Sequence, residues 1–195
     1  MQMIEQRIFP TLVGKFEDVL FPEQCDELIS SIDTTTFKEH KALIGNSVTS
    51  FDKPFIINEL PEHISSNILL KIEICIKQYV EVYGCAPVCL KNTWISYQYH
   101  HSKLKKHTHP GGSISGVLYL RADENSSPIY FYNPNPFASF TTINDTENAF
   151  TREHVKFQPK TGDLLIFPSW LAHGSDVDEN MSKERIILSF NAGDI

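Results

Sequence analysis

The chain has 195 residues, of which 41% are hydrophobic and 21% are charged, as is typical of one soluble globular domain with a full core. Its net charge of -7 argues against binding to nucleic acid, which requires clustered Lys and Arg. The first ten residues lack the layout of a signal peptide, and no apolar run has the length of a membrane helix, so we expect a cytosolic protein.

Two helices are predicted in the first half of the chain. Pro22 can open the first helix. Its apolar face consists of Cys25, Leu28, Ile29 and Ile32. The second helix is predicted from Pro61 to Tyr83, where isoleucines recur every four residues, and Gly84 ends it. Residues 37–58 carry no clear pattern, although Phe51 to Ile57 is compatible with a short strand.

After Gly84 the segments become short, rich in β-branched and aromatic residues, and separated by Gly, Pro and Asn. We predict strands at Val88–Tyr99, His107–His109, Ile114–Arg121, Ile129–Tyr132, His154–Phe157, Asp163–Phe167 and Arg185–Asn191. Asn133 to Pro136 and the polar residues 137–152 are predicted to form a long loop. Many short strands after a helical segment predict a jelly roll, mainly β, with N-terminal helices packed outside it. Within this single domain, residues 1–87 would be a helical support region and residues 88–195 the β core.

Three histidines form a candidate metal site. His107 and His109 are two residues apart, and on a strand this spacing places both side chains on one face. His173 follows a late predicted strand, and in a jelly roll an early strand pair and a late strand commonly lie side by side. Three imidazole ligands would leave about three coordination positions open, as an oxygen-activating Fe(II) site requires.

The other five histidines are assigned no metal role. His40, His63 and His154 are expected to be structural or exposed to solvent. His100 and His101 are adjacent, so on a strand they would point to opposite faces and are unlikely to bind one metal together. We expect both on a loop or at the surface, with a ligand or supporting role for one of them as the alternative.

Cysteines and lysines give weaker signals. In a reducing compartment the four cysteines are expected to be buried thiols rather than disulfides, namely Cys25, Cys75, Cys85 and Cys89. Cys85 and Cys89 lack a second Cys or His pair that would complete a zinc site. The one basic cluster consists of Lys103, Lys105 and Lys106. We expect it to be a solvated loop. The alternative is that it steers an anionic co-substrate toward the histidines.

Arg185 begins the last predicted strand, in which side chains alternate between two faces. One face is wholly apolar and consists of Ile186, Leu188 and Phe190. The other face consists of Arg185, Ile187, Ser189 and Asn191. If this second face lines a cavity, the planar guanidinium can bind a carboxylate through two parallel hydrogen bonds. A surface salt bridge is the alternative, since Glu184 is adjacent.

The tracts HTHPGGSISGVLYL, GDLLIFPSWLAHG and RIILSFN, in this order and spacing, resemble the 2-oxoglutarate- and Fe(II)-dependent oxygenases. More narrowly, they are similar to members related to prolyl hydroxylases that occur often in phage and marine bacterial genomes. The resemblance covers about residues 88–195, and the opening tract IFPTLVGKFEDVL also suits the group. It implies a double-stranded β-helix, which is a cupin-like jelly roll, with Fe(II) as the metal and 2-oxoglutarate as the co-substrate.

The resemblance also implies roles for single residues. His107 would be the first metal ligand and His173 the distal one, whereas His109 stands where most members have Asp or Glu. A neutral imidazole there leaves the metal centre with a higher positive charge, which bears on turnover more than on metal binding.

The co-substrate would be bound on one side of the metal. The resemblance implies that Arg185 binds the distal carboxylate of 2-oxoglutarate, with Tyr119 on the same carboxylate and Tyr97 lining the pocket. Ser189 and Asn191, on the same strand face as Arg185, complete the expected co-substrate site.

The leading hypothesis is therefore an Fe(II)- and 2-oxoglutarate-dependent oxygenase, of the hydroxylase type. One alternative is a cupin-like three-histidine metalloenzyme without 2-oxoglutarate, in which Arg185 would bind a substrate carboxylate. Another is a jelly-roll binding module without catalysis, because a fold does not fix a function. The substrate, whether a peptide or a small molecule, and the oligomeric state do not follow from the sequence.

Overall fold

Two long antiparallel strands, β4 (Val88–Tyr99) and β11 (Glu184–Asp194), form the centre of the main sheet. A computed structural model describes residues 3, 9–53, 55–135 and 151–194 of the chain. In the described part, the main sheet has six strands in the order β1-β9-β6-β11-β4-β3. The four shorter strands are β1 (Gly14–Phe16), β3 (Ser47–Thr49), β6 (Ile114–Arg121) and β9 (Leu164–Pro168).

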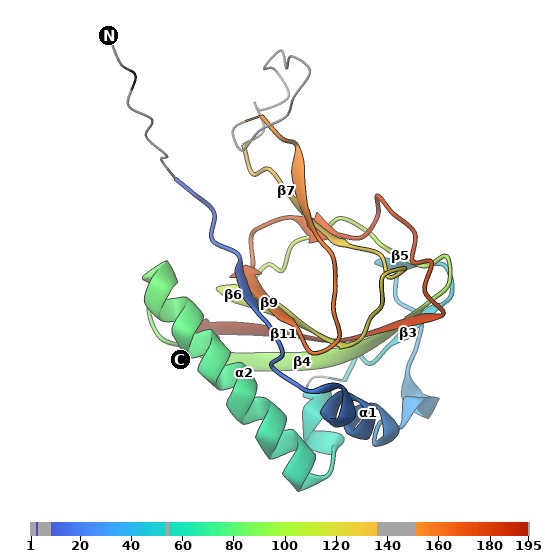
Figure 1. Cartoon of the computed structure of the whole chain (residues 1–195). Helices are drawn as coiled ribbons and strands as arrows, with labels where there is room; N and C mark the ends of the chain where they lie inside the picture. The colour runs from blue at the N-terminus through green and yellow to red at the C-terminus, as the bar shows by residue number, and fades with distance from the viewer. Residues whose placement is uncertain (1–2, 4–8, 54, 136–150, 195) are drawn as a thin grey trace.

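A smaller sheet faces the main sheet, and the two enclose the interior of a jelly roll (Figure 1). Its strand order is β10-β7-β8. The bounds are β7 (Ile129–Tyr132), β8 (His154–Phe157) and β10 (His173–Gly174). A separate two-stranded ribbon, β2 (Leu43–Ile44) with β5 (Lys103–Leu104), lies at one end of the roll. The predicted mainly β jelly roll is confirmed.

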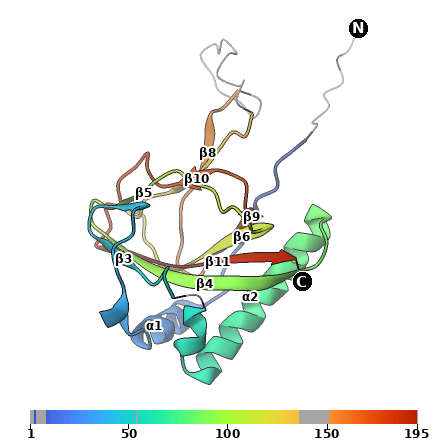
Figure 2. The same cartoon turned by 180° about the vertical axis from the view of Figure 1, so that it is seen from behind.

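The helices cover the opposite face of the main sheet (Figures 1 and 2). They are α1 (Pro22–Ser30) and α2 (Glu62–Tyr83), with short 3-10 turns η1 (Thr34–Thr36) and η2 (Ile56–Glu59). The predicted isoleucine stripe of α2 is buried against the sheet at Ile64, Ile68, Ile72 and Ile76. Gly84 ends the helix with a φ of 75°, a conformation that glycine adopts without a steric cost. None of the helices in the described part combines the length and apolar character that a membrane crossing needs.

The alternation predicted for the last strand separates two environments. Ile186, Leu188 and Phe190 are fully buried in the core between the main sheet and the helices. Arg185 and Ile187 point the other way, into the space between the two sheets. The ring of Phe190 lies against Gly116 on β6, where a Cβ atom would come within 2.2 Å of it. Glycine is therefore required at position 116 by close packing.

Several predictions made from the sequence need correction. Phe51–Ile57 is not a strand, because the backbone of Phe55 has a left-handed φ of 62° and η2 follows at once. The edge of β4 is paired instead with β3. The pairing ends at Ser50, whose amide donates to the carbonyl of Ile95 and whose hydroxyl oxygen accepts from the amide of Ile95.

Residues 136–150 of the predicted loop lie outside the described residues. All four cysteines are free, but only Cys25 and Cys75 are buried, whereas Cys85 and Cys89 are partly exposed.

Candidate functional site

Backbone hydrogen bonds bring the three candidate histidines together. The amide of His107 donates to the carbonyl of His173 at 2.9 Å, and the amide of His173 donates back at 3.0 Å. The amide of His109 bonds instead to the carbonyl of Ser169 at 2.9 Å. The predicted strand His107–His109 is thus an extended segment with a single bridge, because its two ends pair with different parts of the chain. This segment continues the smaller sheet beyond β10.

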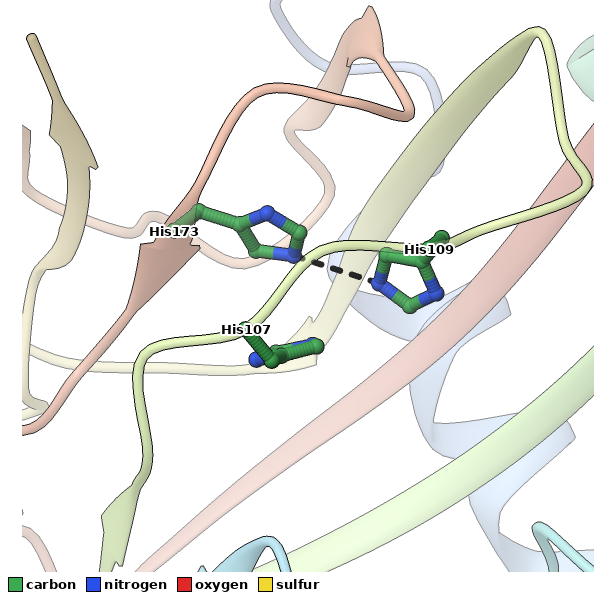
Figure 3. Close-up of side chains that lie close together, drawn as sticks. All are labelled: His107, His109 and His173. Carbon is green, nitrogen blue, oxygen red and sulfur yellow. Dashed lines mark hydrogen bonds between the residues drawn. The ribbon is translucent and has the colours of Figure 1, made fainter. Parts of the chain in front are cut away.

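The three imidazole rings converge, as Figure 3 shows. Their candidate ligand nitrogens all lie within 4.8 Å of one another, and the Nε2 atoms of His109 and His173 are 3.3 Å apart. Nδ1 of His107 lies 2.8 Å from the carbonyl of Lys105, and Nδ1 of His173 lies 2.9 Å from the carbonyl of Leu171. A carbonyl can only accept, so Nδ1 carries the proton and Nε2 is left with a free lone pair.

Burial keeps these histidines neutral. It lowers the pKa of His173 to about 3 and that of His109 to about 4, and the neighbouring His107 lowers both further. The pKa of His107 is also lowered, mainly by burial. Neutral imidazole is the form that binds metal ions. Three neutral imidazoles around one point, two of them oriented by backbone carbonyls, fit a divalent first-row transition metal.

A cavity of about 600 Å³ between the two sheets contains this cluster and Arg185. The Arg185 side chain is only 2% exposed, and its Nη1 donates to Oε1 of Gln98. Its guanidinium lies 5.3 Å from the ring centre of Tyr119. Among the described residues no carboxylate pairs with it, and its Nε has no hydrogen-bond partner. A buried cation without a counter-charge is costly, so the cavity is suited to an anionic ligand at this end.

Gln98 belongs to the same end of the cavity, although no motif or spacing in the sequence points to it. Its side chain is 1% exposed, and its Nε2 has no partner in the described part of the chain. It lies directly opposite Arg185 in the register of β4 and β11. The alternation of β4 places Gln98 on a face with Trp94, but only the strand pairing reveals that this face lines a cavity.

The structure brings most of the predicted co-substrate residues to the cavity. Ser189 and Asn191 line it, and Tyr119 is buried beside Arg185 with no acceptor for its hydroxyl proton among the described residues. Tyr97 is not brought there. It lies on the opposite face of β4, in the core under the helices, with its ring 6.0 Å from that of Phe37. Adjacent strand residues face opposite ways, so Gln98 has the position expected for Tyr97.

The remaining histidines and lysines lie mostly outside the site. His63 and His101 lie at the surface, with ring nitrogens 3.3 Å and 2.7 Å from carboxylate oxygens of Glu27 and Glu179. Local contacts hold the three clustered lysines: Lys103 pairs with Glu179, Lys105 bonds the carbonyl of Lys41, and Lys106 lies over the ring of Tyr132. Nδ1 of His40 accepts a hydrogen bond from the amide of Ala42 at 3.3 Å, and the residue also lines the cavity.

Comparison with protein families gives one match. The family described as "Putative 2OG-Fe(II) oxygenase" matches residues 92–191, a stretch that contains the histidine cluster, Gln98 and Arg185. No protein among those with curated descriptions matches the sequence.

Solved structures share the fold at low sequence identity. The viral collagen prolyl hydroxylase vCPH from Paramecium Bursaria Chlorella virus-1, in complex with 2-oxoglutarate, has a TM-score of 0.59 at 15% identity, over 93% of this chain and 96% of that one. A Pseudomonas putida prolyl-4-hydroxylase has a TM-score of 0.61 at 10% identity, over 95% and 94%. HygX from Streptomyces hygroscopicus, with nickel and 2-oxoglutarate bound, has a TM-score of 0.60 at 11% identity, over 94% and 83%.

Proposed function

Because the chain belongs to the 2OG-Fe(II) oxygenase family, we propose that it is a hydroxylase whose Fe(II) is bound by His107, His109 and His173. We further propose that Arg185 binds the distal carboxylate of 2-oxoglutarate. The environment of Arg185 is the strongest support for this proposal. The buried guanidinium of Arg185 lacks a carboxylate partner among the described residues, and it shares its cavity with the three neutral histidines. A dicarboxylate co-substrate supplies the missing charge at one end and metal-binding oxygens at the other.

Three donors suit the distal carboxylate, two on residues that line the cavity, Arg185 and Gln98, and one on Tyr119, which lies beside Arg185. Nε of Arg185, Nε2 of Gln98 and the hydroxyl of Tyr119 are all buried without an acceptor. Carboxylate oxygens accept several hydrogen bonds, so one carboxylate can satisfy these donors together. The bond from Arg185 Nη1 to Gln98 holds the guanidinium in one orientation before the co-substrate arrives. Asn191 is six residues further along β11, roughly 20 Å away at about 3.3 Å per residue, which is too far for it to bind the carboxylate that Arg185 binds.

The histidines would hold the metal ion in a fixed position, and their low pKa values keep the rings neutral and able to bind it. The Nδ1 contacts of His107 and His173 to backbone carbonyls fix two of the rings. When bound, Fe(II) with 2-oxoglutarate supplies the activation of O₂ needed to oxidise a C–H bond of the substrate. Three neutral ligands leave the full charge of a divalent ion in place, which strengthens its attraction for an anionic co-substrate.

Calorimetry tests the co-substrate assignment directly. Mn(II)-loaded protein is titrated in anoxic buffer with 2-oxoglutarate, and with 2-oxobutyrate as a matched ligand that lacks the distal carboxylate. We expect 2-oxoglutarate to bind at one site and 2-oxobutyrate to bind roughly tenfold or more weakly, because it leaves Arg185 unpaired. Equal affinities, or no binding of 2-oxoglutarate, would refute the role of Arg185.

The three-histidine set favours a second candidate, a metalloenzyme of the same fold that does not use 2-oxoglutarate. The two candidates differ in an assay without substrate. With ascorbate present to supply two electrons and reduce the second oxygen atom of O₂ to water, an Fe(II)-loaded 2-oxoglutarate oxygenase slowly converts 2-oxoglutarate and O₂ to succinate and CO₂ even when no substrate is present. The second candidate forms no succinate.

A further inference from the structure

The cavity extends past the histidines to an end that the proposed co-substrate does not fill. Along β4 its lining residues alternate from Gln98 through Ser96 and Trp94 to Asn92. Along β11 they run in parallel from Arg185 to Asn191, so the two asparagines face each other at the far end. The contact of Trp94 with His109, at 5.6 Å between ring centres, places the candidate metal ligands between the two ends.

The two asparagine side chains offer complementary groups. Asn191 accepts a hydrogen bond at Oδ1 from the hydroxyl of Ser115 at 2.7 Å, which leaves its N–H groups to donate elsewhere. Oδ1 of Asn92 is buried and accepts nothing from the described residues. A free acceptor and a free donor thus lie on directly paired residues of neighbouring strands. A ligand that satisfies both carries a hydrogen-bond donor next to an acceptor.

Beside the asparagines, aromatic rings form a continuous wall. Ring centres are 5.6 Å apart between His109 and Trp94, 5.4 Å between Trp94 and Phe51, and 4.7 Å between Phe51 and His40. His40, Phe51 and Trp94 all line the cavity, and Phe51 is 43% exposed. A wall of this kind packs well against the face of a ring.

The charged residues that line the cavity indicate which charge its ligand can carry. The chain carries 24 acidic residues, yet no Asp or Glu lines the cavity within the part of the chain that the structure describes. The two charged side chains that do line it there, apart from histidines, are Lys41 and Arg185. A cationic substrate would lose its hydration in this cavity without gaining a carboxylate, so the lining disfavours it.

From these observations we infer that Asn92, Asn191 and the wall of Trp94 and Phe51 form the primary-substrate site, and that it takes an uncharged ring with a hydrogen-bond donor beside an acceptor. Lactams, cyclic imides and pyrimidine bases share this chemistry. The inference rests on the proposed function in one respect: the bound ring is a substrate only if the protein is a hydroxylase. Binding of the ring itself needs neither metal nor turnover.

Fluorescence of Trp94 reports binding at this site. Trp170→Phe removes the chain's other tryptophan, which is half exposed and outside the cavity, and leaves Trp94 as the reporter. The protein, with and without Mn(II) and 2-oxoglutarate, is titrated under anoxic conditions with three compounds of equal ring size. They are 2-piperidone, N-methyl-2-piperidone and piperidinium. We also include uracil, and 1,3-dimethyluracil as its donor-free control, to distinguish a lactam from a pyrimidine source.

We expect 2-piperidone or uracil to quench Trp94 saturably, and its N-methylated analogue to bind about tenfold more weakly because Asn92 then stays unpaired. Piperidinium should not bind. Asn92→Ala and Asn191→Ala should each weaken the binding, whereas Asn67→Ala on the exposed face of α2 should not. In Asn92→Asp, which keeps the shape and adds a charge, piperidinium should bind instead.

Preferential binding of piperidinium to the unmodified cavity would overturn the inference, as would lactam or uracil binding that none of the Asn92 and Asn191 variants changes. Absence of binding by every uncharged probe would also overturn it. Each of these outcomes is separate from a failure of the proposed function, because the titrations without Mn(II) and 2-oxoglutarate do not depend on the co-substrate site.

Discussion

Arg185 on β11 and Gln98 on β4 are directly paired across the main sheet, and Nη1 of the arginine donates to Oε1 of the glutamine inside the cavity. This contact satisfies one guanidinium nitrogen with a neutral acceptor and leaves the positive charge uncompensated by any described residue. It also turns the amide nitrogen of Gln98 away from the arginine, where it has no partner. The pair is therefore arranged to receive an anion from the cavity.

Gln98→Glu tests this arrangement with a change of only a few atoms. A carboxylate at position 98 would pair with Arg185 and compete with the co-substrate for the guanidinium. We expect the affinity of the Mn(II)-loaded protein for 2-oxoglutarate to fall at least roughly tenfold in calorimetry, with Mn(II) affinity unchanged. Gln78→Glu on the exposed face of α2 is the matched control. If both variants bind 2-oxoglutarate equally, Gln98 does not orient the anion site.

Histidine variants separate metal ligands from other histidines in the same cavity. His173→Ala should lose Mn(II) affinity by about a hundredfold or more in calorimetry, because one of the proposed ligand nitrogens is removed. His109→Asp should keep the affinity, since a carboxylate also binds divalent metals. His40→Ala is the control, because His40 lines the cavity but lies outside the cluster. Retained binding in His173→Ala would contradict the proposed ligand set.

The low pKa values of the buried histidines predict a loss of stability in mild acid. In the unfolded chain these groups titrate near pH 6.5, whereas burial lowers the folded pKa to about 4 for His109 and about 3 for His173. As the pH falls below 6.5 the unfolded chain binds protons that the folded protein does not, so the free energy of unfolding decreases down to the folded pKa. Each group contributes about 1.4 kcal/mol per pH unit well inside this window.

Urea unfolding of the metal-free protein at pH 7, 6 and 5 measures this dependence. The double variant His109→Gln/His173→Gln should lose less stability between pH 7 and 5 than the wild type. His63→Gln, at the surface, should follow the wild type. Identical pH profiles for the double variant and the wild type would show that the two histidines are not held neutral by burial.

Gly116→Ala tests the packing that separates the cavity from the helix-side core. The added Cβ would lie 2.2 Å from the Phe190 ring, so we expect a loss of about 1–3 kcal/mol in the free energy of unfolding measured with urea. Gly193→Ala, where the nearest atom would be 3.7 Å away, should cost much less. Equal effects of the two substitutions would argue against close contact between Gly116 and Phe190.

Local pattern was sufficient to predict the bounds of β4, β6, β7 and β8, since each is an uninterrupted β-rich run between turn residues. It also predicted the histidine cluster, because spacing by two places neighbouring side chains on one side of an extended segment. The short strands β1, β2 and β5 were not predicted, since only partners distant in sequence define them.

The co-substrate site shows the same limit. Arg185 could be chosen from its own strand, whereas Gln98 and Tyr97 are adjacent and only the register of β4 on β11 decides which of them faces the cavity. That register depends on contacts across the sheet, which periodicity within one strand does not contain. The pairing of Asn92 with Asn191 at the far end of the cavity could not be predicted from local pattern either, because the two residues are 99 positions apart in the chain.

A crystal structure of the protein grown anoxically with Mn(II) and 2-oxoglutarate would show whether the cavity holds the metal and the co-substrate together. We predict one metal ion bound to Nε2 of His107, His109 and His173, with 2-oxoglutarate on that ion and its distal carboxylate on Arg185. A metal bound elsewhere, or a 2-oxoglutarate molecule that leaves the guanidinium of Arg185 unpaired, would refute the proposed metal and co-substrate site.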